Sequence, residues 1–251
     1  MINGKRVVSI ILARKGSKGI PGKNYRKLLN EPLFMWSMLA SLDSKYVDDV
    51  VVSTNCEEVH RSLKWYTRSK TTSKEVPFYI KRPDEISGDF AKNEDALIHA
   101  LDFLKERNEE YDIVLNPQVT SPCRLDGLID KSIEEYDKGG YDSLLTGTKD
   151  TPFLWRKKDG KWIYNIDKND CCNRKMRQEF LEDEFNSDFI FHDCGNLYLT
   201  DRKVLLDTEC RIGNNPCVFE VDGINSLQID TEFDFQIIEQ MIKTRGLKSL
   251  I

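Results

Sequence analysis

Residues 7–24 place a short apolar run directly before a basic, glycine-rich segment. Residues 7–13 read VVSIILA, and residues 14–24 carry three glycines three positions apart and three lysines. A compact run of Val, Ile and Leu is typical of a strand buried on both faces of a parallel sheet. Glycines let the chain turn and approach a ligand closely, and cations at the carboxyl end of such a strand indicate a phosphate-bearing ligand. The sequence therefore predicts a central strand followed by a phosphate-binding loop.

The basic loop stands in a chain that is acidic as a whole. The 251 residues include 37 Lys and Arg against 42 Asp and Glu, a formal net charge of -5. A nucleic-acid binder normally carries a basic face, so this balance argues against that class. No apolar stretch approaches the roughly 20 residues needed to cross a bilayer, and the first residues do not read as a signal peptide. We expect a cytoplasmic protein that contacts neither nucleic acid nor membrane.

The cysteines indicate reduced thiols. Their number is odd and their spacing shows no repeat, at positions 56, 123, 171, 172, 194, 210 and 217. In a cytoplasmic protein such residues are expected to remain reduced. The cysteines and the three histidines do not have the spacing of a metal site, so we expect no zinc.

Strands and helices are predicted to alternate through the first 146 residues. The apolar periodicity predicts strands at 7–13, 50–52, 76–80, 111–115 and 142–146. Helices are predicted between them at 33–42, 57–70, 93–107 and 125–136. This alternation predicts an α/β fold with a doubly wound, mostly parallel sheet. We expect a single domain over residues 1–251.

The pattern changes after residue 149. Residues 153–156 and 161–164 flank an Asp-Gly pair, which predicts a β-hairpin. The segment 149–186 is otherwise charged and irregular, and we interpret it as an insertion. It is either an arm that makes a dimer contact or a solvated excursion. Beyond it we predict a strand at 189–199, a short helix at 201–206, a strand at 216–221 and a last helix at 231–245.

The loop at 14–24 fits neither of two common phosphate-binding patterns. A Walker loop needs Ser or Thr after Gly-Lys, and here Asn24 follows Gly22-Lys23. The dinucleotide fingerprint G-x-G-x-x-G fails too, because these glycines are spaced three and three. The loop is nevertheless unusually rich in glycine and lysine, which favours a phosphate-binding loop. The alternative is an ordinary solvated connection between a strand and a helix.

The segment ARKGSKGIPGKN resembles the signature A-R-x-x-S-K-G-x-P-x-K-N of the acylneuraminate cytidylyltransferases. Members of that family make CMP-sialic acids and related CMP-nonulosonates. The resemblance covers about residues 5–245. It implies a Rossmann-like nucleotidyltransferase fold with a small inserted dimerisation arm at about 149–186, and a loop that wraps the triphosphate of CTP.

The resemblance also assigns roles within this loop. It implies that Arg14 and Lys23 neutralise phosphate charge and that Lys18 acts near the metal and the α-phosphate. Asn24 is implied to position the nucleotide. The implied nucleotide contacts of the loop are Ala13, Arg14, Ser17 and Asn24.

A second polar stretch, with Arg82-Pro83 and Ser87-Gly88-Asp89, resembles the family segment R-P-x-x-L-[AS]-x-D. The resemblance implies that Arg82 and Ser87 approach the cytosine and ribose. The alternative is that Ser87 and Asp89 form a turn and cap the following helix.

A third stretch, QVTSPCR at 118–124, resembles the family segment Q-P-T-S-P-L-R beneath the sugar. The resemblance implies substrate contacts by Gln118, Thr120 and Ser121. The residues alone would also allow Thr-Ser-Pro to begin a helix.

The fourth stretch, IDTEFD at 229–234, resembles the family segment D-I-D-T-x-x-D. A carboxylate at a strand end beside a phosphate loop suits Mg²⁺ (or Mn²⁺), which prefers oxygen donors. The resemblance implies a catalytic, metal-binding role for Asp230. Gln228 stands where the family has its first aspartate, so it is the second candidate ligand although it is uncharged. Capping of the last helix by Asp230 is the alternative.

Upstream of the strand at 189–199, Arg177-Gln178 resembles a family R-Q pair on the arm. The resemblance implies that Arg177 and Gln178 bind the acidic sugar, with Arg174 behind them. Solvated charges are the alternative.

The resemblance implies transfer of CMP from CTP to the anomeric hydroxyl of a nonulosonic 2-keto acid, with release of pyrophosphate, by a homodimer. Two alternatives stay open. The acceptor could be Kdo, another acidic sugar or a phosphonate, or the chain could be a catalytically silent nucleotide-sugar binding protein.

Overall fold

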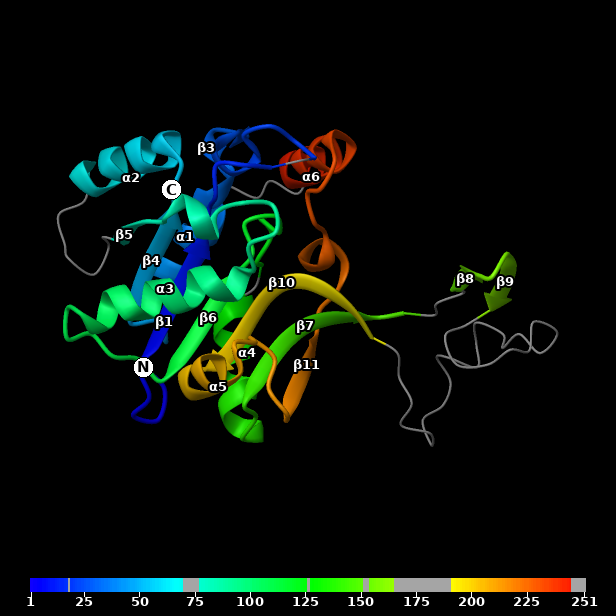
Figure 1. Ribbon diagram of the computed structural model, residues 1–251. Helices are drawn as coiled ribbons and strands as arrows, with labels where there is room; N and C mark the ends of the chain where they lie inside the picture. The colour runs from blue at the N-terminus through cyan, green and yellow to red at the C-terminus, as the bar shows by residue number, and fades with distance from the viewer. Residues whose placement is uncertain (18, 70–76, 126, 151–153, 165–190, 245–251) are drawn as a thin grey trace.

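A computed structural model of the chain describes residues 1–17, 19–69, 77–125, 127–150, 154–164 and 191–244. Its centre is a seven-stranded sheet in the order β11-β7-β10-β6-β1-β4-β5 (Figure 1). The strands are β1 (Val7–Leu12), β4 (Asp49–Thr54), β5 (Phe78–Lys81), β6 (Ile113–Pro117), β7 (Ser143–Lys149), β10 (Phe191–Asp201) and β11 (Pro216–Glu220).

All neighbouring strands pair in parallel except β10, which is antiparallel to both β6 and β7. The predicted mostly parallel sheet is therefore confirmed. Strand β1 lies between β4 and β6, so both of its edges are hydrogen-bonded. This central place explains why residues 7–13 are so uniformly apolar.

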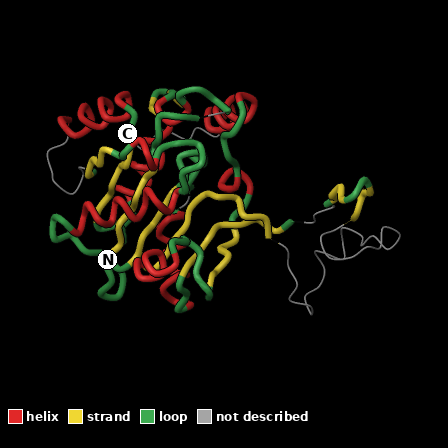
Figure 2. The backbone as a smooth tube through the Cα atoms, viewed as in Figure 1, coloured by secondary structure: helices red, strands yellow, loops and turns green. Residues whose placement is uncertain are grey.

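Side chains of β1 alternate between two hydrophobic clusters, one on each face of the sheet. Val7 and Ile11 belong to the cluster that includes helices α1 (Leu33–Asp43), α2 (Glu57–Ser69), α4 (Leu128–Gly139) and α6 (Glu232–Thr244). Val8 and Ile10 belong to the cluster that includes α3 (Asn93–Lys105) and α5 (Arg202–Thr208). Figure 2 shows helices on both sides of the strands, as a doubly wound sheet requires.

Shorter elements connect these layers. Two-residue strands β2 (Lys27–Leu28) and β3 (Glu31–Pro32) pair with each other before α1. Single 3₁₀ turns lie at Lys23–Tyr25, Asp84–Ile86 and Gly223–Ser226. Within the described ranges, none of the helices is both long and apolar enough to cross a bilayer.

The hairpin expected around residues 158–160 is confirmed. Strands β8 (Trp155–Lys158) and β9 (Lys161–Tyr164) pair antiparallel with each other and not with the large sheet. Asp159 and Gly160 both have positive φ, 50° and 77°, as a type I′ turn requires. Most of the predicted arm at 149–186 lies outside the described residues, as do Arg174, Arg177 and Gln178.

Three helix starts differ from their predictions. The short helix expected from residue 201 begins at Arg202. The helix expected from residue 125 begins at Leu128, after Gly127 with φ 70°. Residues 121–125 therefore run as an extended loop, and the alternative that Thr-Ser-Pro begins a helix is wrong. The last helix begins at Glu232 rather than at residue 231, because Thr231 takes part in its N-terminal cap.

Candidate active site

The carboxyl ends of β1, β5 and β6 surround a cavity of about 430 Å³. Figure 1 shows β1 running upward from the N-terminus toward the loops and the helix α6 above the sheet. The cavity is lined by residues from the ends of these strands, the start of α3 and the segment before α6: Leu12, Arg14, Gly16, Ser17, Gly19, Lys23, Asn24, Arg82, Asn93, Gln118, Val119, Thr120 and Asp230.

The loop after β1 is anchored at both ends. Ala13 is fully buried; its N–H donates to Ser53 O over 3.0 Å, and its carbonyl accepts from the Thr54 hydroxyl. At the other end, Asn24 Nδ2 donates to Arg14 O over 2.8 Å. Ala13 does not line the cavity, whereas Asn24 does. The Asn24 side chain therefore holds the loop closed as well as facing the cavity.

Two glycines allow this loop its shape. A Cβ at Gly19 would lie 2.1 Å from the carbonyl oxygen of Asp230, so the loop packs directly on the segment before α6. Gly22 has φ +69°, a conformation that L residues rarely adopt, and a Cβ there would meet the Tyr25 ring. Both positions need glycine for steric reasons that the spacing alone did not reveal.

Arg14 connects the loop to the segment after β5. Its Nη1 donates to Gly88 O over 2.6 Å and lies 3.5 Å from Asp89 Oδ1. Asp89 is thus a partner of the predicted phosphate-binding arginine, a role that the sequence reasoning missed.

Lys23 connects the same loop to the segment before α6. Its side chain is only 10% exposed, and Nζ donates to Ile229 O over 2.7 Å and lies 3.2 Å from Asp230 Oδ1. The Asp230 carboxylate is 64% exposed and lines the cavity. The predicted cation and the predicted metal ligand therefore form an ion pair across two distant parts of the chain.

Arg82 brings a buried positive charge to the cavity. It is 4% exposed and donates from Nε and Nη2 to the hydroxyl and carbonyl of Ser53, over 3.1 and 2.6 Å. Burial, with a smaller contribution from the nearby Arg14 charge, lowers its pKa to about 10, so it stays protonated at neutral pH. Among the described residues Arg82 forms no ion pair, which leaves its charge available to an anion.

Ser87 lies beside this region without lining the cavity. Its hydroxyl donates to Pro83 O over 2.7 Å, within the turn at Asp84–Ile86. Helix α3 begins at Asn93 and is capped through Lys92 N and the Asp95 carboxylate. The turn formed by Ser87 is therefore present, but the alternative that Ser87 and Asp89 cap the next helix is wrong. Asn93, which no motif indicated, reaches the cavity as the first residue of α3.

The stretch at 118–124 contributes Gln118 and Thr120 to the cavity. Ser121 is fully buried and its hydroxyl lies 3.5 Å from Gly195 O, so it faces the protein interior. Thr120 O accepts from Ile229 N over 2.8 Å, which joins this stretch to the segment that carries Asp230.

Asp230 does not cap α6. Thr231 and Asp234 form a capping box: Thr231 Oγ1 accepts from Asp234 N over 3.3 Å, and the Asp234 carboxylate accepts from Thr231 N over 2.7 Å and from Asp230 N over 3.1 Å. Hydrogen bonding from Thr231 N–H holds the pKa of Asp234 below its usual range. The capping alternative for Asp230 is thus wrong, and its carboxylate remains free to face the cavity.

Gln228 is placed differently from Asp230. Its Nε2 donates to Cys194 O, and a Cβ on Gly195 would lie 2.2 Å from that nitrogen. Gln228 does not line the cavity. Among the described residues, no three His, Cys, Asp or Glu side chains form a metal site. Asp230 alone fits a Mg²⁺ ion that is held by one carboxylate and by substrate phosphates.

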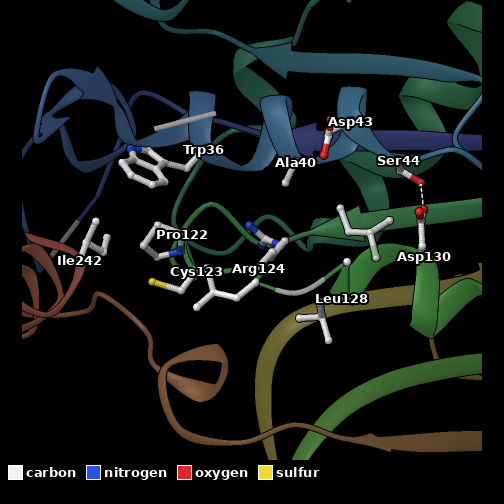
Figure 3. A pocket seen from close by; sticks show the side chains of 13 residues that line it. Trp36, Ala40, Asp43, Ser44, Pro122, Cys123, Arg124, Leu128, Asp130 and Ile242 are labelled. Carbon is white, nitrogen blue, oxygen red and sulfur yellow. Dashed lines mark hydrogen bonds between the residues drawn. The ribbon is translucent and has the colours of Figure 1, made fainter. Parts of the chain in front are cut away.

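A second cavity of about 270 Å³ lies behind the 118–124 stretch, between α1 and the start of α4 (Figure 3). Arg124 in its wall is 8% exposed and binds Ser37 Oγ, Gln118 O and Asn196 O over 2.9, 2.6 and 2.8 Å. Burial lowers the pKa of Arg124 to about 9. This cavity includes none of the predicted phosphate-binding residues, so we place the candidate active site in the larger one.

Lys18 lies outside the described residues, so its predicted role stays a prediction.

The chain is similar to known cytidylyltransferases. A family model described as cytidylyltransferase matches residues 8–171, more than half of the chain. N-acylneuraminate cytidylyltransferase A of Danio rerio is 28% identical over 246 residues, which are 96% of this chain and 52% of that protein. This chain therefore spans about half the length of that relative.

A second relative has nearly the same length as this chain. CMP-N,N'-diacetyllegionaminic acid synthase of Legionella pneumophila is 25% identical over 239 residues, 95% of this chain and 97% of that protein. Among solved structures, CMP:2-keto-3-deoxy-manno-octonic acid synthetase complexed with CTP matches with a TM-score of 0.66 at 15% identity, over 96% of this chain and 99% of that one. At that identity the structural likeness shows the fold alone. From the family match over residues 8–171, which include the basic loop and most of the strand before it, we conclude that this chain belongs to the cytidylyltransferase family of nucleotidyltransferases.

Proposed function

We propose that this chain transfers CMP from CTP to the anomeric hydroxyl of a nonulosonic, sialic-acid-like 2-keto acid and releases pyrophosphate. The names of the two relatives, an N-acylneuraminate cytidylyltransferase and a diacetyllegionaminic acid synthase, support this acceptor class. The family match over residues 8–171 supports the cytidylyl donor.

One observation carries the proposal. Arg14, Lys23 and Arg82 line one cavity together with the exposed Asp230 carboxylate. Three cations at the carboxyl edge of a parallel sheet suit a triphosphate, and the carboxylate suits the divalent cation that accompanies it. An ordinary solvated turn would not bury a lysine and an arginine to 8% and 4% exposure at one cavity.

The proposed reaction is a direct in-line displacement and needs no covalent intermediate with the protein. The acceptor hydroxyl attacks the α-phosphorus in line, a new P–O bond forms, and the bond to the pyrophosphate oxygen breaks. The hydroxyl proton passes to solvent, and pyrophosphate leaves with the bonding electron pair. Catalysis of phosphoryl chemistry depends mainly on positioning and on stabilisation of charge.

Arg14 and Lys23 would stabilise the charge that develops on the phosphate oxygens. Arg82, which the resemblance places near the cytosine and ribose, would add its positive charge to the same cavity. Arg14 and Lys23 are engaged by Asp89 and Asp230, so the nucleotide must replace these partners. Asp230 would hold Mg²⁺, which supplies Lewis-acid stabilisation of phosphate charge when it is bound. Asn24 holds the loop closed through Arg14 O.

The acceptor is proposed to contact Gln118 and Thr120, because both line the cavity and both follow β6 rather than belonging to the basic loop. The predicted contributions of Arg177 and Gln178 remain proposals of the same kind, since those residues lie outside the described part of the chain.

The test is pyrophosphate release. The purified chain is incubated with each of CTP, UTP, ATP and GTP, paired with N-acetylneuraminate, N,N'-diacetyllegionaminate or Kdo, with Mg²⁺ or with a chelator. We expect release only with CTP and a nonulosonate, and no release in the chelator.

The other outcomes separate the alternatives. Turnover of Kdo with no turnover of a nonulosonate would contradict the acceptor class. Measurable CTP binding without release from any pair would favour a silent nucleotide-sugar binding protein. Equal rates with UTP would contradict the cytidylyl donor.

A further inference from the structure

The strands β1 and β6 separate just before the candidate active site. Their parallel pairing ends at Ser9 and Leu115, and Pro117 has no N–H to continue it. At this point the side chain of Asn116 bridges the two strands, because its Nδ2 donates to Ile10 O over 2.8 Å. Asn116 is 2% exposed, and none of the motifs indicated it.

This hydrogen bond determines which way the Asn116 amide faces. A main-chain carbonyl oxygen can only accept, so the nitrogen of Asn116 must face Ile10. The oxygen Oδ1 then faces Gln118, and Gln118 Nε2 donates to it over 2.7 Å. Turning either amide around would bring two oxygens, or two nitrogens, into contact.

Gln118 is held by its main chain as well. Its N–H donates to Asn196 O over 2.9 Å, and its carbonyl accepts from Arg124 Nη2 over 2.6 Å. The side chain lines the cavity, and among the described residues nothing donates to Gln118 Oε1. The amide therefore leaves an acceptor oxygen for a ligand.

We propose that Asn116 is a positioning residue that fixes the amide of Gln118 with its oxygen available to the acceptor substrate. The inference rests on the proposed function, and it specifies which kind of chemical group of the acceptor meets Gln118. The group that meets Gln118 is a hydrogen-bond donor, such as a sugar hydroxyl or an amide N–H. A carboxylate beside Gln118 Oε1 would be repelled by it, so the acid group of the sugar does not bind at that oxygen.

The kinetic test is a double-mutant cycle with Asn116→Ala, Gln118→Ala and the double variant, assayed with CTP and N-acetylneuraminate or N,N'-diacetyllegionaminate. We expect Asn116→Ala to raise the KM for the sugar by about tenfold, the size of about one hydrogen bond. The KM for CTP should stay within about twofold, because the hydrogen bonds of the Asn116 side chain go to Ile10 and Gln118 and not to the described part of the basic loop. In the Gln118→Ala background, Asn116→Ala should not raise the KM for the sugar any further.

If the effects of the two substitutions on the KM for the sugar were additive, or if the KM values for the sugar and for CTP rose equally, Asn116 would only bridge the strands. Either result would overturn the proposal. Circular dichroism shows whether Asn116→Ala is folded. If it is not, Asn116→Ser replaces it in the cycle.

A second readout does not depend on turnover. In the full chain labelled with ¹⁵N-glutamine, the Gln118 side-chain amide signal is identified by its loss in Gln118→Ala. We expect this signal to move in Asn116→Ala, and an unchanged signal would overturn the proposal. If wild-type protein turns over no acceptor, the proposed function fails, whereas the amide signal still decides the Asn116–Gln118 hydrogen bond.

Discussion

Lys23 and Asp230 show how single residues govern the chemistry of this cavity. The Lys23 ammonium lies 3.2 Å from Asp230 Oδ1. Two unit charges of like sign about 4 Å apart repel by about 4 kcal/mol at an effective dielectric constant of about 20, and a divalent ion doubles that figure. The Lys23 charge therefore weakens the binding of a metal ion at Asp230 unless anionic phosphates accompany the ion or Lys23 moves away.

The first prediction concerns this ion pair. Lys23→Met should bind Mn²⁺ more tightly than wild type in the absence of nucleotide, because it removes the competing cation. Turnover with CTP should fall by roughly 10²–10³-fold, by analogy with the loss of one preorganised donor. Titration of free Mn²⁺ by electron paramagnetic resonance measures the binding. Asp230→Asn is the control and should bind no Mn²⁺ in either background; equal affinity of wild type and Lys23→Met would contradict the prediction.

The second prediction uses two glycines of the same loop. Gly19→Ala should destabilise the fold by about 1–3 kcal/mol, because the new methyl group overlaps the carbonyl oxygen of Asp230. Gly16→Ala is the matched control, since a Cβ there meets no atom of the described chain within 4 Å. Its unfolding free energy should change by less than about 0.5 kcal/mol. Urea denaturation measures both, and equal losses would contradict the close packing at Gly19.

At the start of α6, two nearby carboxylates have different roles, one in capping the helix and one in the cavity. Asp234 caps the helix and Asp230 faces the cavity. The two side chains are four residues apart in sequence. The Asp230 carboxylate, the predicted metal ligand, is therefore not used in capping the helix.

The third prediction tests this division. Asp234→Ala should lower the free energy of unfolding by about 1 kcal/mol at neutral pH, the usual cost of a lost cap. The pKa of Asp234 is lowered in the folded state, so its stabilisation is present above the ordinary aspartate pKa. It is lost as the pH falls through the lowered folded value. The difference between the variant and wild type should therefore shrink in acid. A difference independent of pH would contradict the ionised cap.

The whole molecule brings four distant segments to one edge of the sheet. The loop after β1, the turn after β5, the stretch after β6 and the segment before α6 all line the same cavity. Long-range contacts join them in pairs: Arg14 with Asp89, Lys23 with Asp230, and Ile229 with Thr120. This arrangement concentrates positive charge in a chain whose net charge is -5.

The fourth prediction concerns assembly. Leu154, directly before the hairpin β8–β9, and Trp155, its first residue, are 49% and 48% exposed, and we expect the hairpin to contribute to a homodimer. Light scattering should give about twice the chain mass of 29.2 kDa. Leu154→Ser with Trp155→Ser should weaken the dimer, whereas Trp65→Ser, at a residue 68% exposed on α2, should not. A monomeric wild-type chain would contradict the expectation.

Much of the fold could be predicted because its signals are local. The uniform apolar run at 7–13 predicted a strand covered on both faces, and Val7 and Val8 do face separate clusters. Asp159-Gly160 predicted the hairpin, because few other residues accept positive φ at both turn positions. The resemblance to the acylneuraminate cytidylyltransferases also predicted Arg14, Lys23, Arg82 and Asp230, four residues that line one cavity.

The rest could not be predicted because it depends on partners far away in sequence. Ser87 and Asp230 both stand before a helix, and the sequence allowed either to cap it. Only the fold shows that the capping carboxylates are those of Asp95 and Asp234, which lie in the first turns of the two helices. Gln228 was a candidate ligand by position, yet its amide nitrogen binds Cys194 O.

The sequence by itself therefore determined the strand, the basic loop after it and the residue types that meet a phosphate, because periodicity and backbone freedom are properties of neighbouring residues. The tertiary structure decided which cation faces which carboxylate and how the Gln118 amide is turned. Those outcomes depend on contacts such as Lys23 with Asp230 and Asn116 with Ile10, which exist only once the sheet has brought distant segments together.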